Sequence, residues 1–219
     1  MGSSVNWEEI RGDDLNLSYC HHFLEPERAT SLLKTLESEL VYFSGDKAKI
    51  KIFGKWRDIP RQQVAFGDPG LTYTFSGLSV PALAWPKVLE DLRDEIYDRI
   101  GTYFNFVLVN RYRDGRDNIG EHRDDEKELN VNSGIASLSL GQARDFVLRH
   151  KDLKNKIRHV PPVKVILGHG SLLHMKHPTN SFWYHSLPPR KSLPGVRINL
   201  TFRSITRQKE RPSLRKNSL

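Results

Sequence analysis

The segment 120–125, Gly-Glu-His-Arg-Asp-Asp, holds the residue pair with the clearest chemical potential in this chain of 219 residues. His122 and Asp124 are two residues apart, and residues i and i+2 of a strand project from the same face. An imidazole and a carboxylate on one face can supply two ligands of a metal ion. A histidine from a distant strand would complete the 2-His-1-carboxylate triad of non-haem Fe(II) oxygenases, which leaves coordination positions open.

A second pattern lies near the C-terminus, where polar and apolar residues alternate over 197–203. One face carries Arg197, Asn199, Thr201 and Arg203, and the other carries Ile198, Leu200 and Phe202. If the apolar face packs against another layer, two guanidinium groups face the protein interior, where they need anionic partners. A dicarboxylate supplies one carboxylate for each arginine. The alternative is a half-exposed edge strand with solvated arginines.

The third metal ligand is expected before this strand. We select His185, because it lies in the aromatic segment 181–186 and 12 residues before Arg197, which leaves room for one turn. The other candidates are His169, His174 and His177, of which His174 and His177 rank next. Each of these histidines could instead be a hydrogen-bonded structural residue.

The elements that position these residues follow from hydrophobic periodicity. Apolar residues share one face in a helix that starts at Pro26 and in a second that starts at Pro86 and ends before Gly101. Alternation predicts a strand at 47–52 with a turn at 53–54. Later strands are expected at 103–112, 135–149, 163–167, 171–175, 181–187 and 196–205. We therefore predict an α+β protein with helices first and a β-sandwich or closed β-roll after them.

Composition limits the classes of protein. The single cysteine, Cys20, excludes an intrachain disulfide and any multi-cysteine metal site, and it fits a reducing compartment. The sequence shows no apolar run of about 18 residues, so we expect no membrane span. It also shows no signal peptide pattern. The length fits one domain, and we expect a polar lead-in over 1–20.

Charge is distributed unevenly along the chain. The formal net charge is +8, and residues 141–219 alone carry 17 basic and 3 acidic residues. A basic half favours a polyanionic partner such as nucleic acid. A soluble surface with a basic tail is the alternative reading. We expect the Lys- and Arg-rich tail, 207–219, to be disordered.

Together these motifs resemble the AlkB family of Fe(II)- and 2-oxoglutarate-dependent dioxygenases, which repair alkylated nucleobases. The similarity runs from about Leu24 to Ile205 and is strongest to members that act on double-stranded DNA. The segments that carry it are 53–56 (FGKW), 70–77 (GLTYTFSG), 110–112 (NRY), 120–125 (GEHRDD), 177–180 (HPTN), 183–188 (WYHSLP) and 197–203 (RINLTFR).

The resemblance implies a double-stranded β-helix, or jelly roll, over 102–206, and N-terminal helices with a nucleotide-recognition lid over 21–101. It implies Fe(II) at His122, Asp124 and His185, with O₂ as co-reactant. It further implies that 2-oxoglutarate binds through Arg197 and Arg203, assisted by Asn110, Tyr112 and Thr201. The expected reaction oxidises an N-methyl group of a base such as 1-methyladenine or 3-methylcytosine, and it releases formaldehyde, succinate and CO₂.

A methyl group on the pairing edge of a stacked base is out of reach, so the base must leave the helix. We expect a wedge at Phe53, Gly54 and Lys55 and a base pocket of Tyr73, Thr74, Phe75 and Asp125. The alternatives are that Phe53 folds back onto the core and that the aromatic pair is ordinary core. Phosphate contacts are expected from basic residues, which could also be merely solvated: Arg61, Arg149, Lys151, Lys154, Lys156, Arg190 and Lys191.

The expected function is therefore oxidative demethylation of double-stranded DNA by a nuclear, monomeric enzyme. The same chemistry on single-stranded DNA or RNA and a non-catalytic nucleic-acid-binding module remain alternatives. Protein hydroxylation would leave the basic half of the chain unexplained. The chain departs from the family pattern at a shorter loop over 150–160, at Gln62 and at 174–176, which bears on the DNA contacts more than on the reaction.

Overall fold

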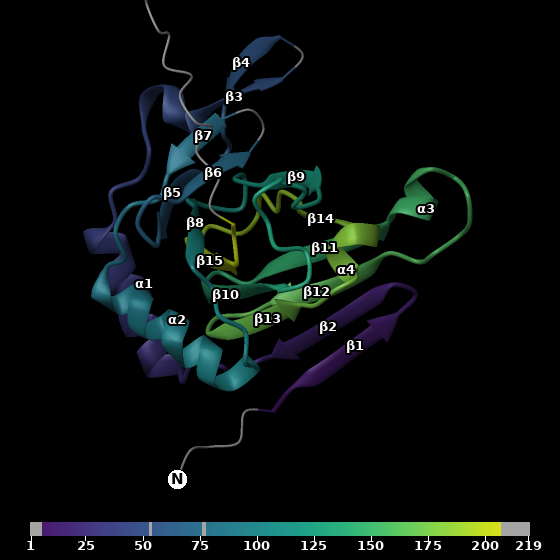
Figure 1. Cartoon of the computed structure of the whole chain (residues 1–219), viewed down its shortest axis with the longest axis horizontal. Coiled ribbons are helices and arrows are strands. Elements are labelled where there is room, and N and C mark those ends of the chain that lie inside the picture. The colour runs from purple at the N-terminus through teal and green to yellow at the C-terminus, as the bar shows by residue number, and fades with distance from the viewer. Residues whose placement is uncertain (1–5, 53, 76–77, 207–219) are drawn as a thin grey trace, which may run out of the picture.

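A computed structural model describes residues 6–52, 54–75 and 78–206. These residues form two main β-sheets, and the larger one is antiparallel and has seven strands (Figure 1). In spatial order these are β1 (Glu8–Gly12), β2 (Leu15–Cys20), β13 (Ser171–Met175), β10 (Ile135–Gly141), β15 (Arg197–Arg203), β8 (Phe106–Tyr112) and β5 (Gln62–Gly67).

The smaller antiparallel sheet has four strands, in the order β12 (Val163–Leu167), β11 (Arg144–His150), β14 (Trp183–Leu187) and β9 (Ile119–His122). Two hairpins stand beside the sheets: β3 (Lys49–Ile52) with β4 (Lys55–Asp58), preceded by the 3₁₀ turn η1 (Gly45–Ala48), and β6 (Thr72–Phe75) with β7 (Leu78–Pro81). Two facing antiparallel sheets with a few helices match the predicted α+β class and are consistent with a jelly-roll core.

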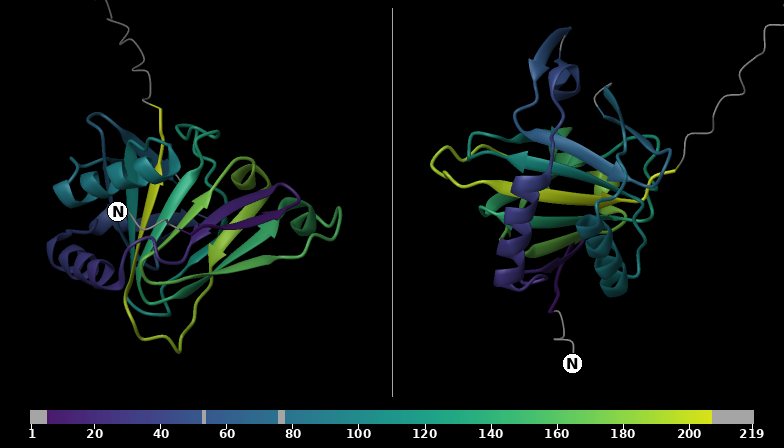
Figure 2. Two further views of the ribbon diagram at one scale, coloured as in Figure 1. Left: turned by 90° about the horizontal axis from the view of Figure 1, so that it is seen from below. Right: turned by 90° about the vertical axis from the view of Figure 1, so that its left-hand side faces the viewer.

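Helices α1 (Pro26–Glu39) and α2 (Lys87–Ile100) lie on the same outer face of the larger sheet (Figure 2). Both predicted helices are confirmed. Pro26 occupies the first turn of α1, where its missing N–H costs nothing, and Gly101 caps α2 with φ of 69°. Buried residues of both helices pack on the outward side chains of the sheet, among them Leu36, Ile96 and Leu200.

Strand β15 shows how this packing orients the predicted polar face. Ile198, Leu200 and Phe202 belong to the core under the helices. Because side chains alternate along a strand, Arg197 and Arg203 point the other way, into the space between the sheets. The predicted strand and its two-faced pattern are confirmed, and the alternative of a half-exposed edge strand is wrong, since β15 is a buried central strand.

The N-terminal segment is not the loose lead-in that we expected. Residues 8–20 form β1 and β2, and β2 pairs with β13 inside the larger sheet. Leu15, Leu17 and Tyr19 are buried between the sheets. The apolar alternation over 15–20 is short, and its partner strand lies about 150 residues away in sequence, so the pairing cannot be seen locally.

Two smaller corrections concern single strands. The predicted strand 135–149 is broken at Gly141, which has φ of 84°, and becomes β10 and β11. The segment predicted to begin a strand at 181 instead starts with the helical turn α4 (Thr179–Phe182) before β14. A further helical turn, α3 (Lys151–Lys154), follows β11.

Two predicted features lie outside the described residues, namely the wedge residue Phe53 and the tail 207–219. None of the helices in the described part of the chain is long and apolar enough to span a membrane.

Candidate metal and cosubstrate site

Strands β9 and β14 bring the two predicted histidine ligands together. His122 and His185 are direct partners across these neighbouring strands, and the centroids of their rings lie 4.3 Å apart. The three other candidates for the third position do not join them. His169 accepts a hydrogen bond from the backbone N–H of Gly141. His174 points to the face of β13 opposite to Leu173 and Met175, which line the cavity, and His177 is exposed beside α4.

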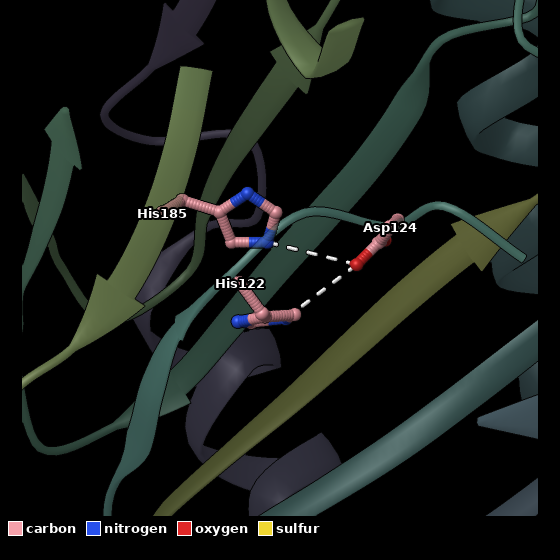
Figure 3. Close-up of side chains that lie close together, drawn as sticks. All are labelled: His122, Asp124 and His185. Carbon is pink, nitrogen blue, oxygen red and sulfur yellow. Dashed lines mark ion pairs between the residues drawn. The ribbon is translucent and has the colours of Figure 1, made fainter. Parts of the chain in front are cut away.

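Asp124 completes the group, although not in the way that the spacing suggested. Strand β9 ends at His122, so Asp124 lies in the loop after the strand rather than on its face. An Oδ1 atom of Asp124 lies 3.5 Å from Nε2 of His122 and 3.6 Å from Nε2 of His185 (Figure 3). One ligand atom from each residue falls within 4.8 Å of the others, which is close enough for a shared metal ion.

Arg203 and Asn180 fix the orientation of Asp124. The guanidinium of Arg203 donates from Nε and Nη2 to Oδ2 of Asp124, at 2.9 and 2.6 Å, and leaves Oδ1 facing the histidines. Asn180 accepts a hydrogen bond from the backbone N–H of Asp124 and donates one to its carbonyl oxygen, at 3.1 and 2.6 Å. Asn180 was not selected from the sequence, because nothing in its spacing shows which backbone it holds.

The protonation states also suit a metal ion. Nδ1 of His122 lies 2.9 Å from the carbonyl oxygen of Gly120, to which it can donate, so the lone pair is left on Nε2. Burial lowers the pKa of His185 and keeps its imidazole neutral, as a metal ligand must be. Burial alone would raise the pKa of Asp124, but the charge of Arg203 and the two imidazole contacts outweigh it and hold that pKa well below its usual range.

A cavity of about 1080 Å³ opens between the sheets next to this group. Arg197 lines it and is only 2% exposed, yet no carboxylate pairs with it among the described residues; its Nη2 donates to Oγ of Ser139, at 2.9 Å. Its Nε is buried without a partner. Burial lowers the pKa of Arg197 to about 10. A buried cation without an anion is costly, so the cavity is suited to an anionic ligand.

The other predicted cosubstrate residues line the same cavity because of strand register. Tyr112 lies opposite Arg197, and Asn110 lies opposite Asn199, across β8 and β15. Oδ1 of Asn110 accepts from Arg61 and Gln63, which turns its amide nitrogen away from them. The hydroxyl of Thr201 donates to Oδ1 of Asn199. The amide nitrogen of Asn199 in turn donates to Ser137 and to the carbonyl oxygen of Leu138, both on β10. Asn199 was noticed only as part of the polar face of its strand.

The predicted base pocket is partly assembled. Tyr73 is buried on β6, with the guanidinium of Arg203 5.2 Å from the centre of its ring. Thr74 and Asp125 line the mouth of the cavity. Phe75 ends β6, and only its backbone is described.

Glu126 is a cavity residue that sequence reasoning missed. It lines the cavity, and its Oε2 is buried without a hydrogen-bond partner in the described structure. A run of acidic residues gives no sign of which one turns inward.

Most of the predicted phosphate-binding residues are already engaged within the protein. Arg61 is half-buried: its Nε donates to Oδ1 of Asn110 in the cavity wall, and burial lowers its pKa. Arg190 lies in the loop between β14 and β15 and pairs with Asp145 of β11. Lys191, next to Arg190, is exposed.

The remaining basic residues lie at the end of β11 and just after it. Nζ of Lys154 lies 3.1 Å and Nη1 of Arg149 lies 3.9 Å from the carboxylate of Glu121. Nζ of Lys151 lies 4.0 Å from the ring centre of Phe182, and Lys156 is exposed. The structure thus groups Arg149, Lys151, Lys154 and Lys156 around α3, and it sets Arg61 and Arg190 apart from them.

The sequence profile of the 2OG-Fe(II) oxygenase superfamily matches residues 16–203. The chain belongs to the 2OG-Fe(II) oxygenase superfamily. Members use Fe(II), 2-oxoglutarate and O₂, and the cavity fits that set: two histidines and a carboxylate converge on one point, and a buried, unpaired Arg197 lies in the same cavity. The predicted cofactors and the enzyme class are thereby confirmed.

Two curated relatives are similar over most of the chain. The DNA oxidative demethylase ALKBH2 of Homo sapiens is 52% identical over 202 residues, which are 91% of this chain and 77% of that protein. The protein of the same name from Bos taurus is 50% identical over 214 residues, 97% of this chain and 77% of the relative. A solved structure titled "The structure of OsALKBH1" covers 91% of this chain and 100% of its own with a TM-score of 0.60, and at 18% identity it supports the fold alone.

Proposed function

We propose that this oxygenase demethylates N-alkylated bases in double-stranded DNA. The observation that carries the proposal is the cavity that holds both the His122, Asp124 and His185 group and the unpaired Arg197. The names of the ALKBH2 relatives supply the substrate class, DNA, and the reaction, oxidative demethylation. 1-Methyladenine and 3-methylcytosine are the proposed lesions.

His122, Asp124 and His185 would hold Fe(II), and Arg197 and Arg203 would bind the two carboxylates of 2-oxoglutarate, with Asn110, Tyr112 and Thr201 beside them. When bound, iron and 2-oxoglutarate activate O₂ for oxidation of the N-methyl group, with release of succinate, CO₂ and formaldehyde. Arg203 would keep its contact with Oδ2 of Asp124, so that one residue orients both the metal ligand and the cosubstrate.

The β3–β4 hairpin supports a duplex substrate. It projects from the body of the protein (Figures 1 and 2), and its described residues include Lys49, Lys51, Lys55 and Arg57. Lys51 also lines the mouth of the cavity. A basic projection beside a deep cavity can grip the phosphates on either side of a base that has left the stack. Phe53 at its tip is proposed as the wedge, with Gly54 allowing the turn at φ of 78°.

The test is a comparison of demethylation on matched duplex and single-stranded oligonucleotides that carry one 1-methyladenine, with the restored base measured by mass spectrometry. We expect turnover on the duplex and a larger loss on the duplex than on the single strand after Phe53→Ala. The matched control is Val41→Ala, because Val41 is 83% exposed and lies before the hairpin. Equal losses on both substrates would reject the wedge, and turnover on single strands or RNA alone would reject the duplex substrate.

We also propose that the enzyme is a nuclear monomer. The proposal follows from a DNA substrate and from the basic C-terminal residues. Fluorescence microscopy of the tagged full chain and light scattering of the purified protein test it. Exclusion from the nucleus, or a dimeric mass, would refute the corresponding half.

A further inference from the structure

Arg144, the first residue of β11, is a second buried cation that the site described so far does not use. It is 2% exposed and forms no ion pair with any described residue. Nη1 and Nη2 donate to three backbone carbonyl oxygens, those of Asp114, Asp117 and Pro188, at 3.3, 2.9 and 2.9 Å. Its Nε has no partner. These contacts tie the loop after β8 and the loop after β14 to the smaller sheet.

Tyr112 connects this arginine to the cosubstrate side of the cavity. The guanidinium carbon of Arg144 lies 5.7 Å from the ring centre of Tyr112, and that of Arg197 lies 5.2 Å from the same ring. One aromatic ring therefore contacts two buried cations, each of which is attracted to its π-electrons. Tyr112 and Arg197 line the cavity, and Arg144 stands behind them.

The nearby carboxylates do not neutralise this pair of charges. The carboxylate of Asp117 is held by Nε and Nη2 of Arg113, at 2.8 and 2.7 Å, and Asp114 faces Arg116. Two like charges at the buried end of a cavity repel each other and create a strongly positive potential there. An anion that binds at this end of the cavity relieves the repulsion between the two arginines. A dicarboxylate fits this requirement, because one of its two carboxylates can bind here.

We propose that Arg144 is a positioning residue for 2-oxoglutarate. It holds the ring of Tyr112 and, through that ring, the guanidinium of Arg197, and its charge strengthens the attraction for the distal carboxylate. The inference rests on 2-oxoglutarate as the cosubstrate and is independent of which nucleic acid the enzyme repairs. Its consequence is that affinity for the cosubstrate depends on a residue outside the cavity.

The test measures binding of 2-oxoglutarate to the iron-free full chain by isothermal titration calorimetry, without DNA. Arg144→Gln and Arg144→Met both remove the charge, and the Met side chain fills the space with apolar atoms. Arg144→Lys keeps the charge. Lys191→Gln is the matched control, since it removes an exposed positive charge from the loop after β14 but leaves the contacts of Arg144 and Tyr112 intact. Circular dichroism before titration establishes that each variant is folded.

We expect the two neutral variants to bind 2-oxoglutarate about tenfold more weakly, and the Lys variant and the Lys191→Gln control to stay within about threefold of the wild type. Wild-type affinity in the neutral variants would overturn the proposal. An equal loss in the Lys variant would overturn the role of the charge, and an equal loss in the control would show that the overall positive charge, not Arg144, sets the affinity. Demethylation assays play no part in these outcomes, so a wrong nucleic acid substrate leaves them unchanged.

Discussion

Arg197 and Arg203 lie on one face of β15, yet their removal should change stability in opposite directions. Arg203 is paired with Asp124 by two hydrogen bonds, whereas no described carboxylate pairs with Arg197. Met is an apolar replacement of comparable length for both. We predict that Arg197→Met stabilises the cosubstrate-free protein and that Arg203→Met destabilises it, while both variants lose 2-oxoglutarate binding.

The magnitudes follow from burial. The pKa of Arg197 falls from its usual 12.5 to about 10. Below pH 10, this fall means that the buried charge lowers the free energy of unfolding by about 3 kcal/mol. Loss of the hydrogen bond to Ser139 offsets about 1–2 kcal/mol of the gain. The free energy of unfolding should therefore rise by about 1–2 kcal/mol, or about 2–8 °C in melting temperature. Arg203→Met leaves a buried carboxylate unpaired and should cost about 3–5 kcal/mol.

The assay is urea denaturation of the iron-free full chain at neutral pH, followed by circular dichroism, with calorimetric titration of 2-oxoglutarate on the same samples. Both variants should fail to bind the cosubstrate, which shows that the two arginines share a function despite their different effects on stability. A loss of more than about 1 kcal/mol in Arg197→Met would mean that the protein itself compensates this charge, and it would refute the reasoning.

Two further predictions concern positions that sequence reasoning judged differently or missed. Burial lowers the pKa of His174 to about 4, so below about pH 6.5 this histidine binds a proton in the unfolded chain but stays neutral in the folded protein. The free energy of unfolding of the wild type, measured by urea titration, should therefore fall by about 2 kcal/mol between pH 8 and pH 5. His174→Met should remove most of that loss. Asn180→Ala breaks both hydrogen bonds to the backbone of Asp124 and should weaken metal affinity about 10–100-fold in a Mn²⁺ titration; unchanged affinity would show that Asn180 does not orient this ligand.

Sequence patterns predicted the features that depend on alternation. The two faces of β15 were visible because a strand repeats every two residues, and that pattern places both arginines between the sheets. His185 could be selected because an aromatic segment and a short turn precede the arginine strand. The two long helices were visible from their apolar faces and from Pro26 and Gly101.

Features that depend on distant contacts could not be predicted in this way. Strand β2 is recognisable only through its pairing with β13, and β1 is a mostly exposed edge strand with little apolar signal. Arg61 was expected to contact DNA phosphates, but β5 pairs with β8 and brings Arg61 against Asn110. Charge alone does not tell a solvated arginine from one that a sheet buries.

The most direct test of the account counts succinate and restored bases in the same reaction, with Fe(II), 2-oxoglutarate and duplex DNA carrying 1-methyladenine. We predict one succinate for each restored adenine in the wild type, and neither product after Asp124→Ala, whose carboxylate lies 3.5 and 3.6 Å from the two histidine nitrogens. Restored adenine in the Asp124→Ala variant, or succinate without restored adenine on any DNA substrate, would contradict the account.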